Sequence, residues 1–267
     1  EIFMSLPKEP HFFSFAEENL PRQAAINNWQ DYQEIFNQAS SNQIKGEAST
    51  SYLLFYKRTI DNLKKYFSDY RQLKIIIILR NPTERAFSHY QFYQMNNVKP
   101  GGRWIIFDYL ETGLYYQSVK AYLENFTNVR IYLYEDLKKD AAALVRDVYQ
   151  FLEVNQSFQP NLKIRYYSGT PKYKKLNDVI INFQNLLITN STLKKSFIPI
   201  IQSIFGNKRK IQLMGEKLIE IIEYFQGKNL YQEKMSAIAA IWLKQFYKDD
   251  ILKLQNLIGR DLSQWLV

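Results

Sequence analysis

Runs of apolar residues and periodic apolar faces along the chain predict where strands and helices lie. The run 75–79 is apolar throughout, which is typical of a strand covered on both faces in a parallel sheet. Directly after it, Asn81 has the residue type of an N-cap, Pro82 suits the first helical position, and Glu84 completes a capping-box spacing. The pattern therefore predicts a strand that ends at Arg80 and a helix that begins at Pro82.

The same alternation extends through the first two thirds of the chain. Strands are predicted at 44–48 and 129–134, and helices at 28–37, 59–70, 82–95, 115–126 and 141–152. This order is typical of a layered α/β domain with a central parallel sheet flanked by helices. From Leu176 onward the periodicity is only helical, including 216–226 and 235–247. We therefore expect a single domain over 1–267, with an α/β part at 1–175 and a helical C-terminal part at 176–267.

Composition narrows the class of protein without identifying a ligand. The 267 residues are 46% hydrophobic and 16% aromatic, which is ample for the core of one ordered domain. The net charge of +9 favours anionic partners such as nucleotides, polyanionic glycans, nucleic acid or a membrane surface. The chain has no cysteine, which excludes zinc fingers, thiol catalysis and disulfides. No cluster of metal-ligating residues is evident, so no metal is expected.

Two of these partner classes find no support in the sequence. The basic run 206–212 lacks interleaved aromatic residues and a recognition-helix pattern, so we expect no binding of nucleic acid. The most apolar segments are too short to span a bilayer, and no secretory signal is present, so a cytoplasmic location without a transmembrane segment is expected.

Arg80 and Ser88 are the first candidate binding residues. A guanidinium at the tip of a strand, beside the N-terminus of a helix, offers a planar fork and free N–H groups to an anion. Ser88 would add a hydroxyl donor two turns into the same helix. The residues alone equally allow Arg80 to form an ion pair at the edge of the sheet while Ser88 only packs.

The whole segment 79–90, LRNPTERAFSHY, resembles the 3′-phosphate-binding segment of sulfotransferases that use 3′-phosphoadenosine 5′-phosphosulfate. The resemblance implies a P-loop-like nucleotide-binding fold in which Arg80 and Ser88 hold the 3′-phosphate. The segment 168–172, SGTPK, is similar to the late loop that closes over the nucleotide in this family. Further donor-binding residues are thus implied at Ser168, Gly169, Thr170, Pro171 and Lys172.

Two other segments resemble the acceptor side of this family. KEPHFF, at 8–13, is similar to a segment of the heparan-sulfate-type branch, which implies Glu9 as the catalytic base and His11 as its polar companion. GEASTSYL, at 46–53, resembles the strand and turn that line the acceptor cleft, which implies that Glu47 and Ser49 contact the acceptor. Some members carry a lysine where this chain has Ala48, so no role of that lysine is carried over.

One family feature is absent between Glu1 and Val267. Members carry a loop like Pro-Lys-x-Gly-Thr-Thr that holds the 5′-phosphosulfate, and the sequence contains neither this loop nor a Gly-x-x-x-x-Gly-Lys motif. The order of segments in the family places the loop just before Glu1, so we expect it upstream of the sequence given.

The resemblance implies a sulfotransferase that moves a sulfuryl group from 3′-phosphoadenosine 5′-phosphosulfate to an acceptor hydroxyl on a glycan, a lipid or a small metabolite. It leaves the acceptor and the oligomeric state open. One alternative is a non-catalytic module of the same fold that binds nucleotides or polyanions. A kinase-like enzyme is the other, but it needs a phosphate loop and magnesium ligands that the sequence does not show.

Overall fold

The computed structural model describes residues 1–6, 8–18, 26–96, 110–160, 162, 169–189, 222, 224, 227–231 and 233–267. The chain groups into two compact units. The first comprises Glu1–Arg85, Phe107–Leu162 and Ala240–Val267, and the second comprises Ala86–Ile106 and Lys163–Ala239. Each unit is described by itself.

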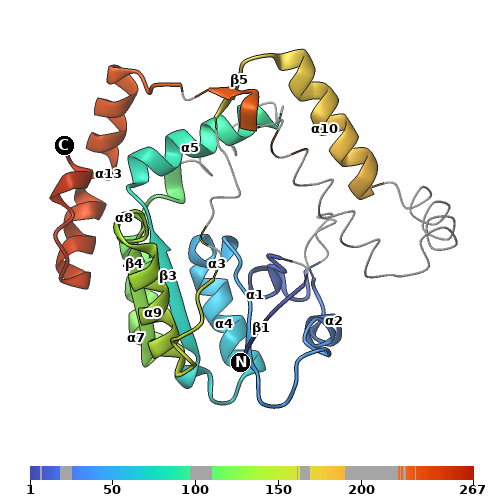
Figure 1. Cartoon of the computed structure of the whole chain (residues 1–267). Coiled ribbons are helices and arrows are strands. Elements are labelled where there is room, and N and C mark those ends of the chain that lie inside the picture. Colours follow the sequence, from blue (N-terminus) through green and yellow to red (C-terminus); the bar gives the residue numbers. More distant parts are fainter. Residues whose placement is uncertain are drawn as a thin grey trace, which may run out of the picture. The chain divides into compact units, whose positions relative to one another are not determined.

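Two pairs of parallel strands organise the first unit (Figure 1). They are β1 (Ile2–Met4) with β2 (Ile44–Gly46), and β3 (Lys74–Leu79) with β4 (Asn128–Leu133). Leu79 lies opposite Leu133, so β3 and β4 end at the same edge. The parallel pairing agrees with the sequence, whereas a single central sheet does not form among the described residues. Among the described residues, the two pairs are separate two-stranded sheets.

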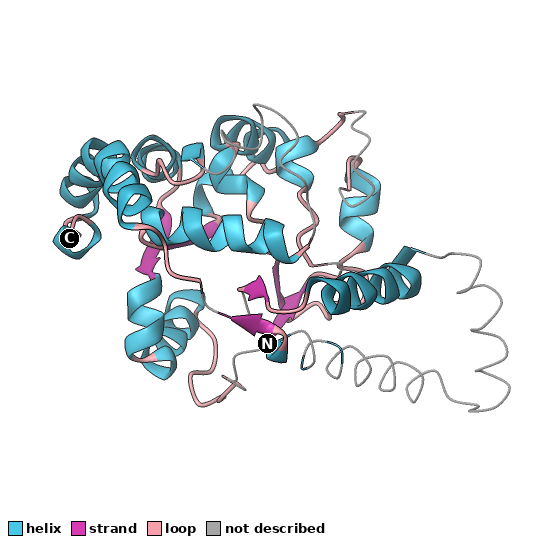
Figure 2. Cartoon of the chain, turned by 90° about the horizontal axis from the view of Figure 1, so that it is seen from above, coloured by secondary structure: helices cyan, strands magenta, loops and turns pink. Residues whose placement is uncertain are grey.

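Helices α4 (Tyr56–Tyr66) and α7 (Tyr116–Asn125) contribute to the core against β3. Their buried side chains share one apolar cluster with β3 and β4, namely Ile60, Leu63, Ile77, Leu79, Val119, Tyr122 and Leu133. Figure 2 shows the strands as short segments among the helices. The other described helices of the first unit are α1 (Phe12–Phe15), α2 (Trp29–Glu34), α3 (Ser51–Leu54), α8 (Tyr134–Lys139), α9 (Ala141–Leu152), η1 (Tyr70–Gln72) and η2 (Ser263–Trp265).

Two long helices, α5 (Pro82–Met95) and α13 (Ala237–Ile258), contribute residues to both units. Helix α5 has the bounds that its capping residues predict, and α13 extends the predicted helix 235–247 by three turns. Most of the predicted helix 216–226 lies outside the described residues. None of the helices in the described parts of the chain is both long and apolar enough to cross a membrane.

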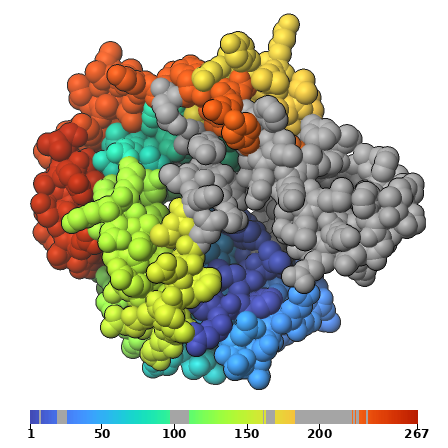
Figure 3. Space-filling view, viewed as in Figure 1, coloured from blue at the N-terminus to red at the C-terminus, as the bar shows by residue number. Residues whose placement is uncertain are grey.

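The N-terminal segment packs against the segment that follows α9. In Figure 3 the blue surface of the first residues lies beside the yellow surface of this later segment. The Oε2 atom of Glu1 accepts a hydrogen bond from the backbone N–H of Asn155 at 2.8 Å. This contact joins residues that are 154 positions apart in the sequence.

A strand pair and helix α10 (Lys174–Thr189) form the described part of the second unit, with part of α5. Strand β5 (Thr170–Pro171) pairs antiparallel with β6 (Leu230–Tyr231). The expectation of only helices beyond Leu176 is therefore wrong at β6, because a two-residue strand is too short to show a period. A Cβ atom at Gly169 would lie 2.9 Å from the carbonyl oxygen of Tyr231, so the approach of the two strands requires glycine there.

Helix α13 caps the N-terminus of α7. The carboxylate of Asp250 accepts hydrogen bonds from the backbone N–H of Tyr115 at 2.8 Å and of Tyr116 at 3.2 Å. A carboxylate at this position satisfies free N–H groups and opposes the positive end of the helix dipole.

We expect Asp250→Ala to lower the free energy of unfolding by about 1–2 kcal/mol, the usual loss for a helix N-cap. Urea denaturation followed by circular dichroism measures the change. Asp249→Ala is the matched control, because it removes the same charge from an exposed position on the same helix. An equal loss in both variants would contradict a specific cap.

Candidate active site

Glu9 and His11 lie in a loop whose backbone is left-handed at both residues, with φ angles of 57° and 56°. Few residues other than glycine adopt this region, and Glu9 is further restricted because it precedes Pro10. Strained backbone of this kind persists only where the surrounding structure holds it, and it is common at functional sites. The strain thus coincides with the two residues that the sequence proposes for catalysis.

Three consecutive hydroxyl residues, Ser49, Thr50 and Ser51, contact this loop and are named the hydroxyl triplet here. The Oγ atom of Ser49 accepts a hydrogen bond from the backbone N–H of His11 at 3.0 Å. Thr50 donates its hydroxyl to Oε2 of Glu9 at 3.0 Å, and the Oγ atom of Ser51 lies 2.8 Å from Nδ1 of His11. Nε2 of His11 is 3.5 Å from Oε2 of Glu9. The structure therefore brings Glu9, His11 and Ser49 together.

Glu47 accepts hydrogen bonds from the hydroxyl triplet and from the neighbouring Tyr52. Its Oε2 atom accepts a hydrogen bond from the Ser49 hydroxyl at 3.0 Å, and its Oε1 atom accepts one from the Tyr52 hydroxyl. Burial raises the pKa of the Glu47 carboxyl, while hydrogen bonds from Tyr52, Ser49 and Tyr32 act in the opposite direction. Burial likewise raises the pKa of the Tyr52 hydroxyl. Glu47 is thus part of an internal network, and its contact with an acceptor stays a prediction.

Arg80 directly follows β3, which ends at Leu79, one residue before the predicted end of the strand, and it lies in a cluster of charges. Its Nη2 atom is 3.3 Å from Oε2 of Glu84, and its guanidinium lies 5.1 Å from the centre of the Tyr134 ring. The Lys138 ammonium is 3.8 Å from the same Glu84 oxygen and 4.8 Å from the same ring. These four residues are named the Arg80 cluster. Two cations share one carboxylate in it, so the ion pair that the sequence allowed for Arg80 is present.

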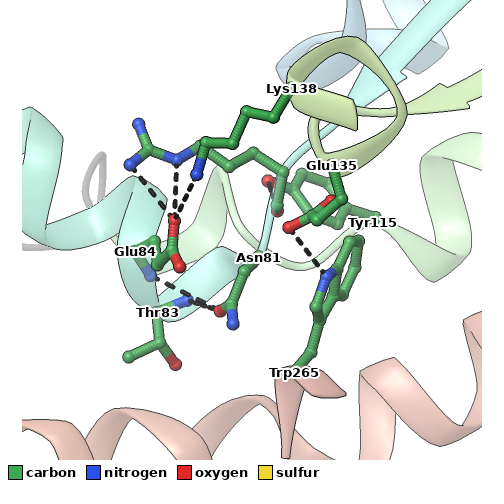
Figure 4. A network of polar contacts seen from close by, with 8 residues as sticks. Asn81, Thr83, Glu84, Tyr115, Glu135, Lys138 and Trp265 are labelled. Carbon is green, nitrogen blue, oxygen red and sulfur yellow. Dashed lines mark hydrogen bonds and ion pairs between the residues drawn. The ribbon is translucent and has the colours of Figure 1, made fainter. Parts of the chain in front are cut away.

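The N-terminus of α5 lies at the same edge as Arg80. Oδ1 of Asn81 accepts hydrogen bonds from the backbone N–H of Thr83 at 3.0 Å and of Glu84 at 3.4 Å, which confirms the predicted N-cap (Figure 4). The Tyr115 hydroxyl donates to the backbone carbonyl of Arg80 at 3.0 Å and fixes the turn. A helix N-terminus beside a guanidinium favours an anion by dipole and by charge.

The other predicted donor-binding residues belong to the second unit. Ser88 lies on α5 and is partly buried. Thr170 donates its hydroxyl to Oε2 of Glu233 at 2.9 Å, and Lys172 donates from Nζ to the carbonyl of Lys228 at 3.3 Å. Pro171 pairs within β5 beside Gly169, and Ser168 lies outside the described residues. The contacts of Thr170, Pro171 and Lys172 lie around the strand pair of β5 and β6. The predicted binding of the nucleotide by all of these residues stays a prediction.

Sequence reasoning missed four residues that the structure places at these sites. Thr50 and Ser51 join the predicted Ser49, and the run Ser-Thr-Ser at 49–51 is a signal that could have found them. Glu84 was recognised only as a capping residue. Lys138 lies on α8, the helix that follows β4, and only the register that aligns the ends of β3 and β4 shows that it is near Arg80.

Comparisons with known proteins agree on one family. The sulfotransferase domain model matches residues 1–237. Sulfotransferase 1C2 of Oryctolagus cuniculus is 28% identical in an alignment over 178 residues that covers 62% of this chain and 56% of that protein. The matched region thus spans little more than half of this relative.

A solved structure shows the same fold. The crystal structure of a sulfotransferase from Alicyclobacillus acidocaldarius matches with a TM-score of 0.65 and 22% sequence identity, and the match covers 99% of this chain and 88% of that chain. At this identity the likeness concerns the fold alone. Because the family model matches most of the sequence, the chain belongs to the sulfotransferase family.

Proposed function

We propose that this protein transfers a sulfuryl group from 3′-phosphoadenosine 5′-phosphosulfate to a hydroxyl group of a glycan, a lipid or a small metabolite. The observation that carries the proposal is the turn from β3 to α5 in a chain of the sulfotransferase family. There, Arg80 and the capped N-terminus of α5 lie at the edge where parallel α/β sheets bind ligands.

The residues at this edge suit a phosphate group. The guanidinium of Arg80 can bind two phosphate oxygens at once, and the Lys138 ammonium lies in the same cluster. In the proposal, Arg80 and Ser88 bind the 3′-phosphate. The segment from Ser168 to Lys172 contributes further contacts to the nucleotide.

Glu9 is the proposed catalytic base, with His11 as its polar companion. The acceptor oxygen forms a bond to sulfur and gives its proton to the Glu9 carboxylate. The bond between sulfur and the bridging phosphate oxygen breaks, and its electrons stay on the phosphate. The Thr50 hydroxyl donates a hydrogen bond to Oε2 of Glu9 and so helps to orient the carboxylate that takes the proton. The donor supplies the sulfuryl group, and the chain supplies position and charge.

The experiment that tests this function is calorimetric titration with 3′-phosphoadenosine 5′-phosphate, with AMP in a parallel titration. Binding that depends on the 3′-phosphate would support 3′-phosphoadenosine 5′-phosphosulfate as the donor. Equally weak binding of both nucleotides would overturn the proposed function. The alternative is a non-catalytic binding module of the same fold. Specific binding without transfer to pooled glycans, glycolipids and phenols would favour that module.

We expect Glu84→Gln to tighten binding of 3′-phosphoadenosine 5′-phosphate by about 2- to 10-fold. The Glu84 carboxylate competes with phosphate for Arg80 and Lys138, and charge pairs near the surface contribute about 1 kcal/mol. Glu124→Gln is the matched control, because it removes the same charge from an ion pair of the same spacing, Lys120–Glu124 on α7. Weaker binding in Glu84→Gln, measured by calorimetry, would contradict this competition.

A further inference from the structure

The His11 ring lies between one acceptor-only group and one hydroxyl. Nε2 is 3.5 Å from Oε2 of Glu9, and Nδ1 is 2.8 Å from Oγ of Ser51. The ring of Phe15 contacts it edge to face, with the ring centres 6.3 Å apart. The ring is therefore held from three sides by residues of the first unit.

The chemistry of these partners sets the position of the His11 proton. An ionised carboxylate can only accept hydrogen bonds, so the nitrogen that points at Glu9 is the one that carries the proton in the neutral ring. Nδ1 then has a lone pair and no proton, and the Ser51 hydroxyl must donate to it. A histidine tautomer is commonly set in this way by the partner of its other nitrogen.

We propose that Ser51 is a positioning residue that donates its hydroxyl to Nδ1 and holds neutral His11 in the Nε2–H tautomer, with that proton directed at Glu9. The relevance to catalysis rests on the proposed function, in which Glu9 is the base. The tautomer itself follows only from the contacts of the loop.

The backbone of His11 is fixed by the same triplet. Ser49 has one hydroxyl proton, which it donates to Glu47, so its oxygen is free to accept the backbone N–H of His11. This hydrogen bond opposes release of the left-handed conformation at His11. Glu47 thus acts on His11 through Ser49, and the ring is presented to Ser51 and Glu9 in one orientation.

The tautomer also distinguishes the two oxygens of Glu9. Thr50 donates its hydroxyl proton to Oε2, and Nε2 of His11 lies 3.5 Å from the same oxygen. Oε1 is accordingly the atom that we assign to take the proton of the acceptor hydroxyl. Ser51 thereby acts on the base only through His11.

Nitrogen NMR of the imidazole rings tests the assignment. The chain has two histidines, so labelling with ¹⁵N-histidine gives two ring spin systems, and His89→Gln identifies that of His11. At a pH where both rings are neutral, we expect Nε2 of His11 to be protonated and Nδ1 to have the shift of a bare nitrogen. Ser51→Ala removes the hydrogen bond to Nδ1, so the Nδ1 shift should change while Nε2 stays protonated beside Glu9, whereas Ser51→Thr should restore the wild-type Nδ1 shift. Ser40→Ala, at an exposed serine, should change nothing.

A protonated Nδ1 in the wild-type protein would overturn the proposal, and so would an unchanged His11 pattern in Ser51→Ala. The wild-type spectrum alone shows which ring nitrogen of His11 carries the proton, so the proposal can be tested even if Ser51→Ala fails to fold. No nucleotide or acceptor is present in this experiment, so its result is independent of the titration that tests the proposed function. If the protein showed the expected His11 tautomer but did not bind the nucleotide, the proposed function would be wrong and the positioning role of Ser51 would still hold.

Discussion

Replacing Arg80 by alanine is expected to weaken binding of 3′-phosphoadenosine 5′-phosphate by about 10- to 100-fold. Hydrogen bonds to charged groups contribute about 1.5–3 kcal/mol, and each 1.4 kcal/mol is a factor of ten in affinity. The substitution also leaves Glu84 without its nearer cation, so its carboxylate would repel the phosphate more strongly. Binding of AMP should change less, because AMP lacks the 3′-phosphate. Calorimetry with both nucleotides measures the two effects.

A double-mutant cycle separates the two causes. Arg80→Ala in the background of Glu84→Gln should weaken binding less than it does alone, because the repelling carboxylate is gone. Arg146→Ala is the matched control, since it removes an exposed arginine of α9 from the same unit. The backbone carbonyl that accepts the Tyr115 hydroxyl remains in Arg80→Ala, so the turn should persist. Equal losses in Arg80→Ala and Arg146→Ala would mean that only net charge matters.

The turn from β3 to α5 could be predicted because its determinants are local. The apolar run, the N-cap Asn81 and Pro82 lie within eight residues, and each acts through its nearest neighbours. Helix α4 begins three residues before the predicted start at Thr59, because the turn that separates α3 from α4 at Phe55 has no glycine or proline to mark it. Local signals thus gave the type of each element more reliably than its ends.

The hydroxyl triplet could not be derived in the same way. Its contacts with the loop at Glu9 join residues 38 to 41 positions apart, and no periodicity encodes such a pairing. The family resemblance implied Glu9 and His11, but the left-handed backbone at both residues became visible only in the structure. Likewise, the sequence identified Arg80 without Lys138, because their proximity depends on the parallel register of β3 and β4.

Glu9→Gln is expected to reduce the rate of sulfuryl transfer by about 10²- to 10⁴-fold, the usual contribution of a general base. Glutamine keeps the size of the side chain and can still accept the hydrogen bond from Thr50, but its amide cannot take a proton from the acceptor. Affinity for 3′-phosphoadenosine 5′-phosphate should be unchanged, because the donor is bound by other residues in the proposal. Transfer of ³⁵S from the labelled donor to pooled glycans, glycolipids and phenols measures the rate.

Two further variants distinguish a role of Glu9 as the catalytic base from a purely structural role. Glu34→Gln removes an exposed carboxylate elsewhere in the same unit and should leave the rate intact. Glu9→Asp keeps a carboxylate that can accept a proton, but its side chain is shorter by one methylene group. It should therefore lose less activity than Glu9→Gln. If Glu9→Gln transferred sulfuryl groups as fast as the wild type, the base would have to be another group. An equal loss in Glu9→Asp and Glu9→Gln, with weaker nucleotide binding in both, would show that Glu9 supports only the strained loop around Pro10.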